Sequence, residues 1–155
     1  MSIATIEELT AELVGLVQTA PSIGVKGYSV FNTDELTQIS KSIGFPLAGV
    51  SYEGAFKKEN SAQATNKAYK SSSIVTLRFV VVIGIEYKYA SEVDRKPTAT
   101  NLLDEVRQIV LGYQGVNSRP WRFTGELPLE SEVECAILYG QMWETDIPVT
   151  GKSPT

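Results

Sequence analysis

The residues of this 155-residue chain that could perform chemistry are few, and the most reactive is the single cysteine, Cys135. The chain contains no histidine, which excludes Ser-His-Asp and Cys-His catalysis and most zinc sites. Cys135 lies in the pattern Val-x-Cys-x-Ile, which is typical of a strand with one buried face. We therefore interpret it as a small buried hydrophobe and not as a nucleophile.

Nucleotide-binding motifs are incomplete. The sequence Gly151-Lys152-Ser153 resembles the end of a phosphate-binding P-loop, but Asp146 stands where that motif needs its first glycine, and no helix is expected afterwards. No GxGxxG sequence is present either. The sequence thus predicts no cofactor.

Two groups of charged residues could bind a partner or an ion. Four acidic residues share strand parity near the C-terminus and could pair with a basic group or hold a hard cation, but we interpret them as solvated strand ends and predict no metal site: Glu132, Glu134, Glu144 and Asp146. Four lysines lie in or beside a polar stretch and form the candidate docking site: Lys57, Lys58, Lys67 and Lys70. Solubility and docking to an acidic surface both remain open for these lysines.

Composition narrows the function classes. Eighteen acidic and 14 basic residues give a net charge of -4, so sequence-specific nucleic-acid binding is not expected. The first apolar positions are interrupted by Glu7, Glu8 and Glu12, so no signal peptide is expected. The apolar run 74–85 is too short for a membrane-spanning helix. One cysteine and no targeting segment predict folding in a cytoplasm.

The tryptophans Trp121 and Trp143 are expected in the core or at its rim.

The elements that would position these residues can be read from hydrophobic periodicity. Apolar residues from Ile6 to Val17 predict an amphipathic helix with a Thr5/Glu8 capping box. A strand over 25–31 and a short helix closed by Gly44 follow. An extended segment over 47–56 comes next, and then a mobile surface loop over 57–73.

Two long strands dominate the second half of the chain. Residues 74–89 alternate with a core face, and residues 132–149 predict the last strand. Between them, a polar turn with Pro97 leads to a helix over 102–113, capped by Thr98 or Thr100 and followed by Gly115, and then a strand over 120–126. The prediction is an α+β fold with an antiparallel or mixed sheet of long strands and two main amphipathic helices on one face. We expect one domain over 1–150 and a C-terminal tail over 151–155.

The length of these strands has a consequence for assembly. Strands of about 16 residues run roughly 50 Å, whereas the radius of gyration expected for this chain length is about 15 Å. Their ends should therefore bend or project beyond the core. The face that carries Thr76, Arg78, Val80 and Val82 is apolar in its middle, which favours a partner there and makes self-assembly the simplest use.

Two regions carry a resemblance to a known family. The first is Phe45-Pro-Leu-Ala-Gly-Val-Ser-Tyr-Glu-Gly54. The second is Leu102-Leu-Asp-Glu-Val-Arg-Gln-Ile-Val-Leu-Gly112, continued by Pro120-Trp-Arg-Phe-Thr-Gly-Glu126 and by the strand around Tyr139 to Pro148. Together they resemble the tail terminator proteins of long-tailed bacteriophages, more closely those of Mu-like phages with contractile tails. With the N-terminal helix, this pattern of elements covers nearly the whole chain, except for the poorly matched segment 57–73.

The resemblance implies a non-enzymatic virion protein of the tail and neck that is assembled in the bacterial host cytoplasm. In that family, helices pack on an antiparallel sheet and the subunits form a homohexameric ring. The ring caps the tail tube, stops its polymerisation and joins the tail to the neck. The implied partners are further copies of the chain, the tail tube protein, the sheath protein of a contractile tail and a head-side neck or connector protein, with no membrane. The genome can pass through such a ring.

Three other functions stay open. Another head-tail completion protein, or a tube or sheath adaptor, would have similar size and chemistry. A small-molecule or peptide-binding module could use an open sheet face. An enzyme that works with carboxylates and lysines alone is the least favoured of the three.

Overall fold

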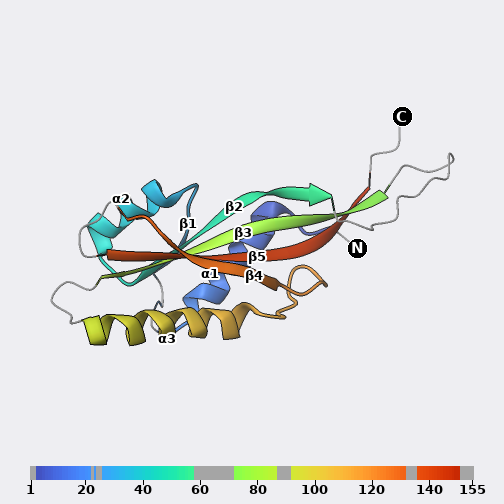
Figure 1. Ribbon diagram of the computed structural model, residues 1–155. Helices are drawn as coiled ribbons and strands as arrows, with labels where there is room; N and C mark the ends of the chain where they lie inside the picture. Colours follow the sequence, from blue (N-terminus) through green and yellow to red (C-terminus); the bar gives the residue numbers. More distant parts are fainter. Residues whose placement is uncertain are drawn as a thin grey trace.

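The chain forms a five-stranded sheet with helices on both faces (Figure 1). This computed structural model describes residues 3–21, 23, 26–57, 72–86, 92–131 and 136–150. Its elements, in chain order, are α1 Ile6–Gln18, β1 Gly27–Ser29, α2 Thr33–Ile43, β2 Leu47–Lys57, β3 Ser72–Glu86, α3 Glu92–Val110, β4 Arg122–Leu129 and β5 Ala136–Thr150. The sheet order is β1-β2-β3-β5-β4. Among the strands that the structure describes, only the β1–β2 pair is parallel, so the predicted α+β fold with a mixed sheet is confirmed.

The two long strands pair with each other along their whole length. The antiparallel register runs from Ser72 opposite Thr150 to Glu86 opposite Ala136, about 50 Å of ribbon at the usual rise per residue. Figure 1 shows the ends of β2, β3 and β5 extending together past the helices. The expectation that the strand ends project beyond the core is confirmed.

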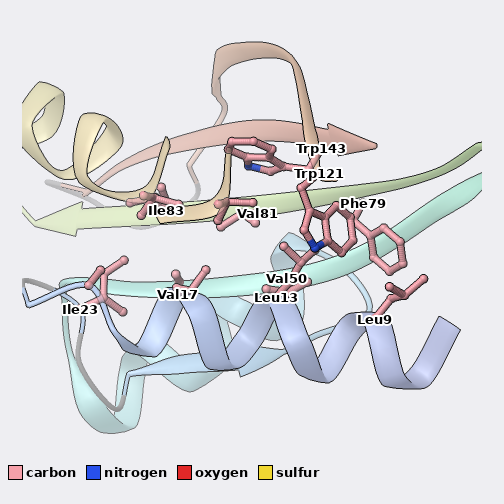
Figure 2. Packing of buried hydrophobic residues seen from close by; sticks show 14 of the residues in the cluster. Leu9, Leu13, Val17, Ile23, Val50, Phe79, Val81, Ile83, Trp121 and Trp143 are labelled. Atoms are coloured by element: carbon pink, nitrogen blue, oxygen red, sulfur yellow. The ribbon is translucent and has the colours of Figure 1, made fainter. Parts of the chain in front are cut away.

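One face of the sheet, called here the first face, carries the main core. Alternation along β3 places Leu77, Phe79, Val81 and Ile83 on this face. Helix α1 covers it with Leu9, Leu13 and Val17, which are fully buried at helical spacing (Figure 2). Thr5 and Glu8 form the predicted capping box, with Thr5 Oγ1 accepting from the Glu8 N–H.

Helix α3 is the second helix on this face and differs from its prediction at both ends. It begins at Glu92 and contains Pro97, Thr98 and Thr100, so the expected polar turn and threonine caps are wrong. Pro97 is the sixth residue of the helix, beyond the first turn, so its missing N–H removes a helical hydrogen bond and its ring is expected to crowd the preceding turn. The helix ends at Val110, and the left-handed residue after it is Gly112, with φ of 77°, instead of the expected Gly115.

The opposite face, the second face, is covered at one end by the third helix, α2. Asn32 caps this helix by accepting from the Glu35 N–H, and Gly44 closes it with φ of 76°. Leu36 packs with Val30, Leu47, Val82 and Leu138 in a second apolar cluster. The contact is close: a Cβ added at Gly84 would lie 2.6 Å from a ring carbon of Phe45.

Candidate functional site

An open groove lies on the second face, beside the N-terminal end of α2. Its floor is apolar and comes from three neighbouring strands, because alternate residues of each strand point to this face: Val80 and Val82 of β3, Gly140 and Met142 of β5, and Leu127 and Leu129 of β4. The groove has a volume of about 390 Å³, which lies in the range of ligand and side-chain binding sites.

The walls of the groove are more polar than its floor. They are made by Phe31, Asn32 and Thr33 at the start of α2, by Ser51 and Glu53 of β2, and by Arg78. Phe31 is 91% exposed, although large aromatic side chains are normally buried in a monomer. An apolar floor and an exposed aromatic rim together favour a partner over bulk water.

A charged cluster lies beyond the groove, toward the projecting ends of β3 and β5. Asp146 accepts hydrogen bonds from Arg122 Nη2 at 2.9 Å and from Thr76 Oγ1 at 2.8 Å, and its side chain is only 4% exposed. Arg78 pairs with Glu144 at 3.2 Å and stacks over the Phe56 ring. The interpretation of Glu144 and Asp146 as solvated strand ends is therefore wrong, because strand pairing places an arginine beside each carboxylate. Glu132 and Glu134 lie outside the described residues.

Three exposed apolar residues, together called the loop patch, lie on the connection between α3 and β4. They are Leu111, Tyr113 and Val116, with Leu111 61% exposed. This connection packs against α1, so it belongs to the first face. Sequence reasoning missed the patch because Tyr113 continues the apolar spacing of α3 and is interpreted as part of its buried stripe.

The loop patch is held by hydrogen bonds at its base. Glu12 of α1 accepts from the Trp121 indole N–H at 2.8 Å and also from the Val116 N–H. Asn117 is buried and donates to Thr145 Oγ1 and to the Asp146 carbonyl at 2.9 and 2.8 Å. The backbone N–H of Gly112 donates to the Trp121 carbonyl at 2.9 Å. The apolar side chains are thus presented from a fixed backbone.

Both edges of the sheet carry features that oppose strand addition. Strand β1 covers only Ala48–Val50 of β2, and the exposed remainder of that edge has a register shift between Tyr52 and Gly54 and ends in Lys57. The opposite edge strand, β4, contains Pro128 and a register shift between Phe123 and Gly125. Bulges, prolines and lysines at edges weaken pairing with another chain.

The predicted docking lysines are placed only in part. Lys57 is the exposed last residue of β2, opposite Val75 of β3, so the strands take in Lys57, Ser72 and Ser73 from the predicted loop. Lys58, Lys67 and Lys70 lie outside the described residues, as do Cys135 and the sequence Gly151-Lys152-Ser153. The docking role of the four lysines stays a prediction.

Both tryptophans lie in the core, as predicted. Trp121 packs edge-on against Phe79 with ring centroids 5.3 Å apart, and Trp143 packs similarly against Phe123 at 5.4 Å. Within the described ranges, no group of three or more metal-ligating side chains is placed to hold an ion. Among the helices that the structure describes, none is long and apolar enough to cross a membrane.

One solved structure to which the chain is similar is a chain of the virion of a native gene transfer agent particle, with a TM-score of 0.42 and 16% sequence identity, covering 91% of this chain and 86% of that chain. No protein-family model matches the sequence, and no curated protein matches it.

Proposed function

We propose that this chain is a non-catalytic virion subunit that acts as a tail terminator: it forms a homohexameric ring that caps a phage-type tail tube, stops its polymerisation and joins the tail to the neck. Its proposed partners are further copies of itself, the tail tube protein, a sheath protein in a contractile tail and a head-side connector protein. The proposal places it in the virion, after assembly in the host cytoplasm.

The observation that carries the proposal is the half-covered second face of the sheet. Leu127 and Phe31 are exposed beside a groove with an apolar floor, and the paired ends of β3 and β5 extend past the helices (Figure 1). Apolar surface of this kind is costly to leave in water and marks protein contacts. In an assembly, neighbouring subunits would cover both the groove and the projecting strand ends.

The sequence resemblance narrows the kind of assembly. Its first stretch, Phe45–Gly54, forms the entry to β2 and the part of that strand under α2. Its second stretch, Leu102–Gly112, forms the C-terminal half of α3 and the turn after it. The continuation Pro120–Glu126 leads into β4, and Tyr139–Pro148 is the centre of β5. The resemblance thus involves the sheet and one of its covering helices, the parts that would form a ring wall.

A second candidate function uses the same groove. A module that binds a peptide or small molecule needs an apolar pocket with a few polar groups at its rim, and the side chains of Asn32, Ser51 and Arg78 supply them here. This function predicts a monomer that binds its ligand at 1:1. The tail-terminator function predicts association between identical copies.

Removal of the gene from the cell that makes the particles tests the proposal. Without a terminator, tube subunits continue to add, so electron microscopy should show overlong tubes without heads. Adding back the purified chain during assembly should restore uniform tube length. Tubes of normal length, joined to heads in the absence of the chain, would exclude this function.

A further inference from the structure

We infer that the groove on the second face binds an extended segment of a different virion protein, one that presents a lysine or arginine beside an apolar residue. The cation of that segment lies at Glu53, and its apolar side chain lies on the groove floor. The inference rests on the proposed function, which requires protein partners, and it names the chemistry of the partner that this groove recognises.

The wall of the groove sets the sign of the partner's charge. Within the part of the chain that the structure describes, the carboxylate of Glu53 has no ion pair and no hydrogen bond, and the residue is exposed. The other charged lining residue, Arg78, is already paired with Glu144 at 3.2 Å. The wall is therefore left with one uncompensated negative charge.

The first turn of α2 adds to this negative charge. Asp34 and Glu35 lie in that turn, directly after the lining residues 31–33, and the helix N-terminus offsets only about half an elementary charge. The exposed ring of Phe31 offers a cation a further favourable contact. This side of the groove thus attracts a positive group and repels a negative one.

The floor of the groove suits the apolar part of the same segment. It is made by apolar side chains, and Leu127 among them is 44% exposed. Lysine and arginine have long aliphatic stems that cover apolar surface while the charged end stays at a polar rim. An acidic segment would bring like charges together at Glu53, and a wholly apolar one would cover Glu53 without a partner, which costs free energy. A basic residue with an apolar neighbour satisfies floor and wall together.

The charge of the whole chain favours a different protein as the occupant over a second copy. The chain has 18 acidic and 14 basic residues and a net charge of -4, so a second copy would bring a surface that is acidic on balance to an acidic groove. The groove is also open and its floor spans three strands. It would leave much of a small ligand in water, although small-ligand sites usually enclose what they bind. An extended protein segment can cover the whole floor.

Short synthetic peptides serve as probes of the groove. The basic probe is acetyl-Gly-Leu-Arg-Leu-Gly-amide, and the acidic probe has glutamate in place of its arginine. Backbone amide NMR spectra of the isotope-labelled chain detect weak binding and locate it. The basic probe should shift the signals of Ser51, Val80 and Met142, which lie at the groove. The acidic probe should bind about tenfold more weakly, because attraction at Glu53 is replaced by repulsion.

A charge reversal at the wall gives the sharpest test. Glu53→Lys should reverse the preference, so that the acidic probe binds more tightly than the basic one. Glu7→Lys is the matched control, because it changes the net charge equally from an exposed position on α1, on the other face of the sheet. It should keep the parent's preference. Circular dichroism checks that both variants fold. If either does not, Glu53→Gln and Glu7→Gln replace them, and the first should then abolish the preference.

Several results would overturn the inference: no binding of the basic probe, shifts confined to residues outside the groove, equal binding of both probes, or an unchanged preference in Glu53→Lys. A control variant that loses the preference as well would mean that the net charge of the chain selects the probe. If the basic probe instead separates associated copies in sedimentation, a second copy occupies the groove and the inferred partner is wrong.

Particle assembly separates failure of this inference from failure of the proposed function. In cells that make the particles, Glu53→Lys should reproduce the tail defect seen without the gene, and Glu7→Lys should not. If removal of the gene gives overlong tubes but Glu53→Lys restores normal tails, only the inferred partner is wrong. If removal of the gene leaves normal tails, the proposed function is wrong.

Discussion

The two faces of the sheet are built from the same strands but are covered very differently. On the first face, α1 and α3 bury the side chains that point toward them, and Phe79, Val81 and Trp143 are fully buried. On the second face, α2 is the one helix among the described elements and covers one end. The neighbouring valines Val80 and Val81 show the difference, since Val81 is fully buried and Val80 is only partly so. The first face stabilises the fold, and the second leaves surface for a partner.

Alanine substitutions on the two faces of β5 should give the largest difference in the free energy of unfolding. Trp143→Ala removes a fully buried indole that packs on Phe123 and should lower the free energy of unfolding by about 3 to 5 kcal/mol. Met142→Ala, the next residue but on the groove floor, should lower it by less than about 1 kcal/mol, because little cavity forms in an open groove. Urea unfolding of both variants measures the difference. Similar losses at the two positions would mean that the two faces contribute equally to the core.

Substitutions in the charged cluster of the second face should have the next largest effect on the free energy of unfolding. Asp146→Ala removes the acceptor of Arg122 and of the buried Thr76 hydroxyl, and we expect a loss of about 2 kcal/mol. Asp146→Asn keeps an acceptor oxygen and should lose less. The same urea titration checks both variants. An alanine variant as stable as the parent would show that the cluster is a solvated strand end after all.

Glycine substitutions compare the covered and open ends of the second face. Gly84→Ala would place a methyl group 2.6 Å from Phe45 and 3.0 Å from Leu138, so we expect a loss of about 1 to 2 kcal/mol from overpacking. Gly140→Ala meets its nearest atom, on Leu129, at 3.2 Å, and should change stability by less than about 0.5 kcal/mol, because reduced freedom of the unfolded chain offsets the contact. Thermal melting of the two variants side by side measures the order. A reversed order would place the tight packing at the groove.

Phe31→Ser should have the smallest effect on the isolated chain. The ring is 91% exposed, so its removal should change the free energy of unfolding by less than about 0.5 kcal/mol. The same change should weaken binding of the basic probe peptide, because the ring lines the groove. Melting and peptide titration on one sample separate the two effects. A clear loss of stability would indicate that Phe31 supports α2 instead.

Much of the fold could be predicted because its signals are local. Alternation from Val75 to Ile85 gave the core face of β3, and the Thr5/Glu8 capping box gave the start of α1. The start of α3 could not be predicted, because its first turns are polar and Pro97 reads as a turn. The sequence also suggested a partner on the face of Val80, where the groove lies.

The parts of the site that were missed depend on contacts between distant residues. Asp146 is buried because the pairing of β4 with β5 brings Arg122 next to it, and this register is not visible in either segment alone. The groove exists because α2, with 11 residues, covers only one end of a much longer sheet. The loop patch exists because α3 stops at Val110 and the chain turns at Gly112.

The central claim, that this chain is the ring at the end of a tail tube, is tested most directly by an electron cryo-microscopy reconstruction of the capped end of an assembled tail. The account predicts a closed homohexameric ring of this chain on the last tube layer. An open arrangement, a ring built from another protein, or this chain located away from the tube end would contradict it.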